Sequence, residues 1–340
     1  MLAYLIQFDF SALSVIALML CVFLGILFLV WGGHCLTDGA VRIAHIFKIS
    51  PLIIGLTIVS IATSMPELFT CLRAIQESAD LALGSIVGSN IANIGLILGF
   101  AAWISPLHSD LRLIQKELPF LLILSLLFVF FAFTGGGFSS GEGLSLILIA
   151  GAYLFWVIHH ALREKDVPID ELDGSLGAVA ASDSSSGKFS VLALAVFWVL
   201  VGALLLSLGA DCLVESARIL ALRFGLSEVF IGLSIVALGT SLPELAASLS
   251  ASLKNNNSLC VGNVIGSNLF NLSLIGGSSA LFYPFEVDLE FFWLEFPLLI
   301  FATLMLYFFL WQRQAVIGRA RGTILLVFYV FVIVLIGLNG

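Results

Sequence analysis

The stretch IIGLTIVSIATSMPEL at residues 53–68 occurs again, in closely similar form, as FIGLSIVALGTSLPEL at residues 230–245. A second pair follows, with GSIVGSNIANIGLILG at 84–99 and GNVIGSNLFNLSLIGG at 262–277. The glutamates of the first pair are 244 − 67 = 177 residues apart, and the first asparagines of the second pair are 268 − 90 = 178 residues apart. Chance similarity between apolar helices would match Leu and Ile, but it would not match T-S-x-P-E and G-S-N-x-x-N. The chain therefore contains an internal repeat.

The composition of the 340-residue chain indicates that lipid is its main solvent. Hydrophobic residues make up 60% of the sequence and charged residues 11%, with a mean hydropathy of +1.15. A soluble domain is about half apolar and about a quarter charged. This difference excludes a cytosolic enzyme, a nucleic-acid-binding protein and a disordered chain. The five cysteines are spread out with no CxxC or Cys/His cluster, so we expect apolar packing and no disulfide or metal framework.

The apolar residues form continuous stretches long enough to cross a bilayer, which takes about 20 residues per helix. A transmembrane barrel would instead alternate apolar and polar residues. The sequence therefore predicts an all-α integral membrane protein with about ten transmembrane helices. The approximate spans are 14–36, 51–73, 81–103, 118–134, 143–160, 190–211, 228–252, 258–280, 292–311 and 323–338.

The repeat divides the chain into two five-helix units, 1–162 and 190–340, joined by a linker at 163–189. The linker is acidic at first and then rich in Ser, Gly and Ala, which is typical of a flexible connection. It lacks the DxDxDG spacing of a calcium-binding loop. Because five is odd, repeated helices must cross the membrane in opposite senses. This is an inverted-topology repeat, the architecture of many secondary transporters.

The distribution of basic residues predicts the orientation of the helices. With the N-terminus outside, eleven Lys and Arg residues fall in inside loops, and only Arg73, Arg218 and Arg223 fall outside. Positive residues favour the cytoplasmic side. We therefore expect a multi-pass protein of the cell (inner) membrane, with both termini outside and the central loop cytoplasmic.

Glu67 and Glu244 are the most informative side chains, because each lies near the middle of a predicted span. A carboxylate there is costly unless it is paired or solvated, and it marks a functional site. Pro66 and Pro243 precede them and are expected to kink the helices. The kinks would free backbone carbonyls, which are tolerated at membrane depth where they line an enclosed cavity.

The residues around these glutamates supply further oxygen atoms at helical spacing. Thr63 and Ser64 precede Glu67 by one turn, as Thr240 and Ser241 precede Glu244. The second motif adds two Ser/Asn pairs at i and i+4, together with GxxxG spacing that favours close helix packing. Oxygen ligands of this kind suit Ca²⁺ and Na⁺ and disfavour zinc or copper. The pairs are Ser89 with Asn93 and Ser267 with Asn271.

The motifs ATSMPE and GTSLPE, each followed by GSNxxN, resemble the two alpha repeats of the cation/calcium antiporter superfamily, and in particular those of prokaryotic sodium/calcium exchangers. The resemblance implies that Glu67 and Glu244 are shared ligands of Ca²⁺ and Na⁺. It further implies carbonyl ligands for Ca²⁺ at Thr63 and Thr240 and for Na⁺ at Ser60 and Ala237. Hydroxyl ligands for Na⁺ would come from Ser64, Ser241, Ser89 and Ser267, and Asn93 and Asn271 would complete the central site.

The expected function is thus secondary antiport of Ca²⁺ against Na⁺ by alternating access, not enzyme catalysis. We expect Ca²⁺ and Na⁺ as the substrates and the lipid bilayer as the environment of the protein. No cofactor or nucleic-acid partner is expected. A Ca²⁺/H⁺ antiporter remains the alternative, because buried glutamates also bind protons. A cation channel fits an inverted repeat poorly, and an intramembrane enzyme lacks its motif, such as HExxH. The sequence does not fix an oligomeric state.

Overall fold

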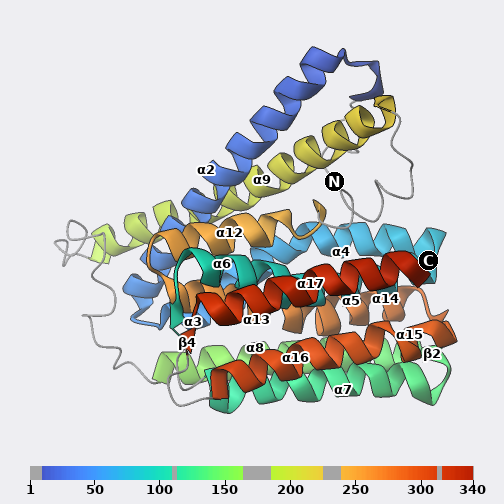
Figure 1. The fold of residues 1–340 in the computed structure, drawn as a ribbon. Coiled ribbons are helices and arrows are strands. Elements are labelled where there is room, and N and C mark those ends of the chain that lie inside the picture. The colour runs from blue at the N-terminus through green and yellow to red at the C-terminus, as the bar shows by residue number, and fades with distance from the viewer. Residues whose placement is uncertain (1–9, 109–112, 164–184, 225–238, 312–315, 340) are drawn as a thin grey trace.

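The computed structural model describes residues 10–108, 113–163, 185–224, 239–311 and 316–339. These residues are almost entirely helical (Figure 1). The described ranges contain nine helical stretches long and apolar enough to cross a membrane. The expected tenth span, 228–252, is described only from residue 239 onward, where it includes helix α12. Large apolar side chains such as Trp31, Phe133 and Phe155 are exposed on the outer surface, as expected for a protein surrounded by lipid.

The elements of the first half begin with a 3₁₀ turn and include three segments of π-helix, η2, η3 and η4. In chain order they are η1 (Phe10–Ala12), α2 (Val15–Phe47), α3 (Pro51–Ile54), η2 (Gly55–Val59), α4 (Ser60–Glu77), α5 (Ala79–Ala92), η3 (Asn93–Leu98), α6 (Gly99–Ile104), β1 (Leu107–His108), η4 (Leu113–Glu117), α7 (Leu118–Thr134), β2 (Gly137–Phe138) and α8 (Ser140–Arg163).

The described elements of the second half follow the same order. They are α9 (Ser185–Arg223), α12 (Leu242–Leu253), α13 (Asn257–Phe270), the π-helical segment η7 (Asn271–Ile275), α14 (Gly276–Phe282), β3 (Phe285–Glu286), α15 (Leu289–Trp293), α16 (Glu295–Trp311), β4 (Val316–Ile317) and α17 (Arg319–Asn339).

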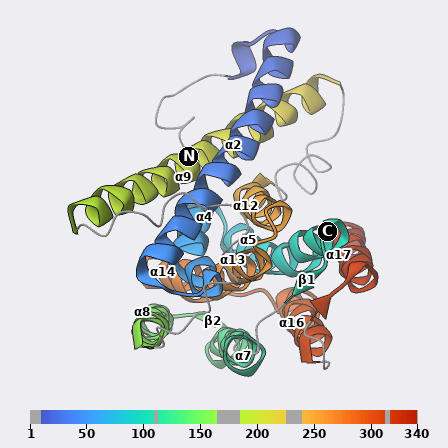
Figure 2. The same ribbon diagram turned by 90° about the vertical axis from the view of Figure 1, so that its left-hand side faces the viewer.

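Two long helices, α2 and α9, run antiparallel across one side of the molecule, while α7, α8 and α16 lie on the opposite side (Figures 1 and 2). Glycines let the backbones of α2 and α9 touch. A Cβ added to Gly32 would lie 2.9 Å from the carbonyl oxygen of Gly202, and one added to Gly25 would lie 2.9 Å from that of Gly209. Gly202 is the repeat equivalent of Gly25, and Gly209 is that of Gly32, since 202 − 25 and 209 − 32 both equal 177. The two helices therefore cross through equivalent segments of the repeat.

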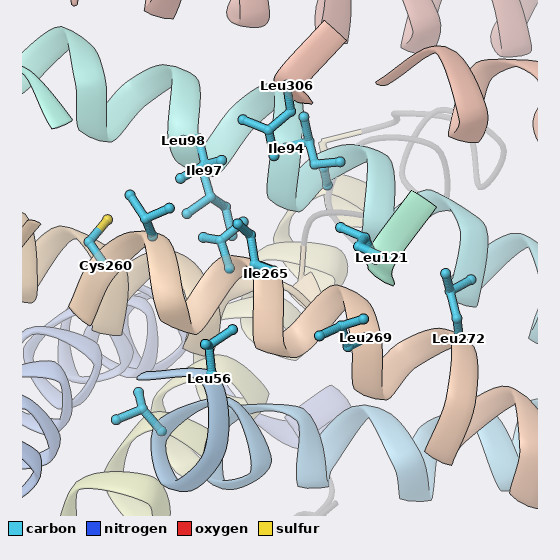
Figure 3. Close-up of a cluster of buried hydrophobic side chains, with 14 of the residues drawn as sticks. Leu56, Ile94, Ile97, Leu98, Leu121, Cys260, Ile265, Leu269, Leu272 and Leu306 are labelled. Carbon is cyan, nitrogen blue, oxygen red and sulfur yellow. The ribbon is translucent and has the colours of Figure 1, made fainter. Parts of the chain in front are cut away.

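The centre of the molecule is formed by α4, α5, α12 and α13, which carry the repeated motifs. The helical stretch Asn257–Phe282 is the most enclosed, with 94% of its most apolar part buried. Figure 3 shows apolar side chains from both halves around α13, among them Leu56, Ile97 and Leu269. A Cβ added to Gly266 would lie 2.8 Å from the Cα of Leu56, so the predicted close helix approach is present in this half. In the first half the prediction is wrong, because a Cβ added to Gly84 or Gly88 would meet nothing within 4 Å.

Two short antiparallel strand pairs connect the halves at opposite ends of the bundle. β1 pairs with β4, and β2 pairs with β3. β1 and β3 are equivalent in the repeat, since 285 − 107 = 178. Each half therefore contributes one strand to the pair at each end, as an inverted repeat requires.

The two long helices extend further than the sequence indicated. The predicted spans end at residues 36 and 211, before Asp38 and Glu215. Both acidic residues lie within the continuous helices α2 and α9, so these helices are longer than the predicted spans. Asp38 forms an ion pair with Lys254 (2.5 Å), and Glu215 forms one with Arg218 (2.6 Å). Ion pairing lets charged residues remain in a helix that continues past the apolar stretch.

Candidate ion-binding site

The two repeated glutamates are enclosed at the centre of the molecule. Glu67 lies on α4 and is 4% exposed, and Glu244 lies on α12 and is 0% exposed. The buried polar side chains of the described ranges include no Lys or Arg. Two buried carboxylates without a basic partner repel each other in a medium of low dielectric constant. The arrangement therefore favours a bound cation.

The helices that carry the glutamates differ at their prolines. In the first half, α4 remains helical through Pro66 and follows directly on the π-helical η2. In the second half, Thr240 and Ser241 form a turn, and α12 begins at Leu242 with proline in its first turn. A proline in the first turn displaces no helical hydrogen bond, whereas one in the interior leaves a carbonyl without its usual donor.

The serine hydroxyls cross from one half to the other. Ser64 shares α4 with Glu67, yet it donates to Glu244 Oε1 of the other half at 3.0 Å. Ser241 correspondingly donates to Glu67 Oε1 at 3.4 Å, and Ser89 donates to the same oxygen at 3.1 Å. The i, i+3 spacing predicted a hydroxyl beside the carboxylate of its own helix. The structure instead joins the two motifs into one site.

The asparagines of the second motif mark the start of a π-helical segment in each half, with η3 beginning at Asn93 and η7 at Asn271. Short π-helical segments are frequent at functional sites. The amide of Asn271, oriented with its nitrogen toward the acceptors, donates to Glu67 Oε2 at 3.1 Å and to the carbonyl of Ser267 at 3.1 Å. Asn93 instead donates to Asn268 Oδ1 at 2.9 Å.

Several buried oxygen atoms at the centre have no hydrogen-bond partner within the described part of the chain. They belong to Glu244 (Oε2), Asn93 (Oδ1) and Ser267 (Oγ), all at most 1% exposed. An unsatisfied buried acceptor costs about 1–3 kcal/mol. Cation coordination would satisfy all three. These atoms are ready-made oxygen ligands of the hard type that binds Ca²⁺ or Na⁺.

The structure brings together most of the residues expected at the site. Ser64 hydrogen-bonds to Glu244, while Ser89, Ser241 and Asn271 hydrogen-bond to Glu67, so each glutamate accepts a hydroxyl from the other half. Thr63 is buried beside these residues and donates to the carbonyl of Ser60 at 3.3 Å, while Thr240 is half-buried in the turn before α12. Ala237 lies outside the described residues.

Further buried polar residues that the sequence reasoning did not single out surround this set. Asn268 Nδ2 donates to the backbone carbonyl of Asn90 at 3.3 Å, and Asn263 Nδ2 donates to Ser248 Oγ at 2.9 Å. The signal for Asn90 and Asn268 was available, because both belong to the repeated G-S-N. No group of three or more His, Cys, Asp or Glu side chains suited to a metal occurs in the described ranges. The candidate site thus relies on two carboxylates and neutral oxygens.

An inverted five-helix repeat with a central polar site, exposed to lipid on the outside, defines a membrane ion transporter. The sequence matches the family described as "Sodium/calcium exchanger protein" at residues 14–159 and 194–338. Because these segments cover most of the chain, the protein belongs to the sodium/calcium exchanger family. The family consists of transporters that exchange Ca²⁺ and other cations, and the expected antiporter class is confirmed.

Individual relatives agree with this assignment. The chain is 33% identical over 345 residues to the sodium/calcium exchanger MaX1 of Methanosarcina acetivorans, covering 93% of this chain and 97% of that protein. It is 32% identical over 304 residues to the inner membrane protein YrbG of Escherichia coli, covering 88% and 91%. A solved structure of the sodium-calcium exchanger NCX_Mj, soaked with 10 mM Na⁺ and zero Ca²⁺, superimposes with a TM-score of 0.80 at 29% identity and covers 94% and 99%. The expected fold of two inverted five-helix repeats is confirmed.

Proposed function

We propose that this protein exchanges Ca²⁺ for Na⁺ by alternating access at the site between the two T-S-x-P-E and G-S-N-x-x-N motifs. The observation that carries the proposal is the pair of buried carboxylates, Glu67 and Glu244, which serine hydroxyls link across the halves. Among the residues that the structure describes, neither glutamate has a buried basic partner. Two negative charges match one Ca²⁺. The surrounding neutral oxygens match Na⁺, which needs several oxygen ligands.

The charge of the site supplies the reason for obligatory exchange. With no cation present, the two carboxylates repel each other, and closing the site away from water on both sides is unfavourable. One Ca²⁺ or several Na⁺ ions remove this repulsion. The protein therefore changes the side of access only when loaded, so outward movement of one ion requires inward movement of the other. This coupling follows from the enclosed pair of glutamates.

We assign the ligands as follows. Glu67 and Glu244 bind both ions, and the carbonyls of Thr63 and Thr240 add to the Ca²⁺ site. The carbonyls of Ser60 and Ala237 and the hydroxyls of the four motif serines serve Na⁺. Asn93 and Asn271 complete the central position. The unpartnered oxygens of Glu244, Asn93 and Ser267 support this assignment.

Uptake of ⁴⁵Ca²⁺ into proteoliposomes that contain the purified protein tests the proposal. We expect uptake when the vesicles are loaded with Na⁺ and diluted into Na⁺-free buffer, with the pH held equal on both sides. Uptake should be absent when Na⁺ is replaced by choline. Uptake driven fully by a proton gradient in Na⁺-free buffer would establish the Ca²⁺/H⁺ alternative and refute the Na⁺ assignment.

We further propose that both termini face outward and that the central linker is cytoplasmic, since eleven of the fourteen Lys and Arg residues then lie inside. A cysteine substituted at Ser184, in a variant whose native cysteines are replaced by serine, should resist an impermeant maleimide in intact cells. It should be labelled after the membrane is opened. Labelling of intact cells would reverse the orientation.

A further inference from the structure

The hydroxyl of Thr63 lies among three groups that can accept its hydrogen. Its Oγ1 is 3.3 Å from the carbonyl oxygen of Ser60, one turn earlier on α4, and 3.4 Å from Oδ1 of Asn263 on α13. The carboxylate of Glu244 lies within reach of the same hydroxyl. A threonine hydroxyl has one hydrogen, so these acceptors compete for it.

Two of the three acceptors are assigned as ion ligands, and the third is not. In the proposed function, the carbonyl of Ser60 binds Na⁺ and the carboxylate of Glu244 binds both ions. A hydrogen directed at either group occupies a lone pair that a cation would use, and its positive charge repels the cation. Asn263 Oδ1 has no place in the ligand set. A hydrogen bond from Thr63 to Asn263 therefore leaves both ligands open.

Ser248 favours the orientation of the Asn263 amide that this bond requires. Nδ2 of Asn263 donates to Oγ of Ser248 at 2.9 Å, so that Oδ1 faces Thr63. All three side chains are at most 1% exposed, so water does not compete for these bonds. Ser248 lies one turn after Glu244 on α12. The helix that carries the carboxylate thus also holds the competing acceptor in place.

Neither the repeat nor the packing of the helices requires an amide at this position. The equivalent of Asn263 in the first half is Ser85, since 263 − 178 = 85. The close approach of α13 to the first half is made by glycine, as at Gly266 beside Leu56. At 3.4 Å, the bond from Thr63 lies beyond the usual range of O–H···O bonds and adds little to that packing. Its acceptor is better explained by the hydrogen that it attracts.

We propose that Asn263 is a positioning residue for ion binding, whose Oδ1 takes the hydrogen of Thr63. The Ser60 carbonyl and the Glu244 carboxylate then keep their lone pairs for the cation. Asn263 does not bind an ion itself and acts only through Thr63. The inference rests on the proposed function, because that function assigns Ser60 and Glu244 as ligands.

A double-mutant cycle on Asn263 and Thr63 tests the inference. Asn263→Leu keeps the approximate shape and removes the acceptor, so the hydrogen of Thr63 turns to a ligand oxygen. We expect the affinities for Ca²⁺ and for Na⁺ to fall about fivefold, the value of one neutral hydrogen bond. In a Thr63→Val background there is no hydrogen to direct, and adding Asn263→Leu should change both affinities less than about twofold. The measurements are equilibrium ⁴⁵Ca²⁺ binding to the full chain in detergent and displacement of the bound ⁴⁵Ca²⁺ by Na⁺.

Ser248→Ala is the matched control, and it needs no change at Thr63. It breaks the 2.9 Å bond of the same amide but keeps Asn263 Oδ1, which Thr63 still attracts. Both affinities should therefore fall no more than about twofold. A fall as large as that of Asn263→Leu would mean that the tie between α12 and α13 matters and not the acceptor, which would overturn the inference. This comparison decides the question if Thr63→Val prevents folding, which thermal unfolding in detergent detects.

The possible results separate the inference from the proposed function. An equal fall of affinity in both backgrounds would show that Asn263 only supports the fold, and no fall in the background with Thr63 would show that its oxygen is not used. A folded Thr63→Val variant that no longer binds Ca²⁺ would show that the hydroxyl oxygen itself is required. Each of these results overturns the inference. A wild-type protein that binds Ca²⁺, shows the expected cycle and fails to exchange Ca²⁺ for Na⁺ would refute the proposed function alone. A wild-type protein that does not bind Ca²⁺ would refute both.

Discussion

The two repeats contain nearly the same polar motifs, yet they surround their glutamates differently. Glu67 accepts hydrogen bonds from Ser89, Ser241 and Asn271, so both of its oxygens are satisfied. Glu244 accepts one from Ser64 to Oε1, and its Oε2 has no partner among the described residues. The helix of the first repeat continues through its proline, whereas the helix of the second begins there.

This difference shows that the motif alone does not determine the environment of its carboxylate. Each glutamate depends on residues from the other half, so its surroundings change with the relative position of the halves. The alternating access that we propose needs the two halves in different conformations at any moment. In the present conformation, the first half supplies the satisfied carboxylate and the second half supplies the open one.

Replacing either glutamate should produce the largest effect. Glu67→Gln or Glu244→Gln leaves a bound Ca²⁺ half-compensated, which costs several kcal/mol and should lower Na⁺-driven Ca²⁺ uptake at least about 100-fold. The thermal stability of the two variants should differ in buffer without Ca²⁺ or Na⁺. Glu244→Gln removes the negative charge of a buried carboxylate whose second oxygen accepts no hydrogen bond from the described residues, so it should raise the unfolding temperature more than Glu67→Gln. Glu77→Gln, at the exposed end of α4, is the matched control with unchanged uptake. Near-normal flux in either site variant would refute the shared-ligand assignment.

Replacing the two prolines with alanine should change the stability of the protein by different amounts. Pro66 lies inside α4, where a proline costs about 3 kcal/mol relative to alanine, so Pro66→Ala should raise the unfolding temperature in detergent. Pro243 lies in the first turn of α12, where its missing N–H costs nothing, so Pro243→Ala should change stability by less than about 0.5 kcal/mol. Equal shifts for the two variants would mean that the halves do not differ as described.

The serines should give the smallest effects and show how the halves are joined. Ser64→Ala, Ser89→Ala and Ser241→Ala each remove a neutral hydroxyl worth about 1–2 kcal/mol. We expect each to weaken the Na⁺ dependence of uptake more than Ca²⁺ binding, because Na⁺ sites have fewer charged ligands. Ser145→Ala, on the outer helix α8, is the control.

Pairs of these variants sharpen the comparison. Ser89 and Ser241 bind the same oxygen of Glu67 and lie 3.5 Å apart, so their combined effect on Na⁺ dependence should be non-additive. Ser64 and Ser89 bind different glutamates, and their effects should add. Additive effects for both pairs would mean that Glu67 does not couple its two serines.

The fold was largely predictable because lipid imposes a simple rule on sequence. About 20 continuous apolar residues are needed per span, and charged residues inside a span must have a function. The nine described spans, the inverted repeat and the central glutamates follow from this rule. The lengths of α2 and α9 did not, because their ends carry the charged residues Asp38 and Glu215. The partner of Asp38, Lys254, meets it only once the helices are packed.

By itself, the sequence determined the membrane class, the two inverted repeats and the residue types of the site, because hydropathy and repetition are local properties of the chain. The tertiary structure decided which hydroxyl meets which carboxylate, which amide presents its oxygen, and which oxygens remain unpartnered. These contacts join residues about 175 positions apart, as between Asn93 and Asn268. No spacing along one helix can specify such a contact, since it depends on how the two halves pack against each other.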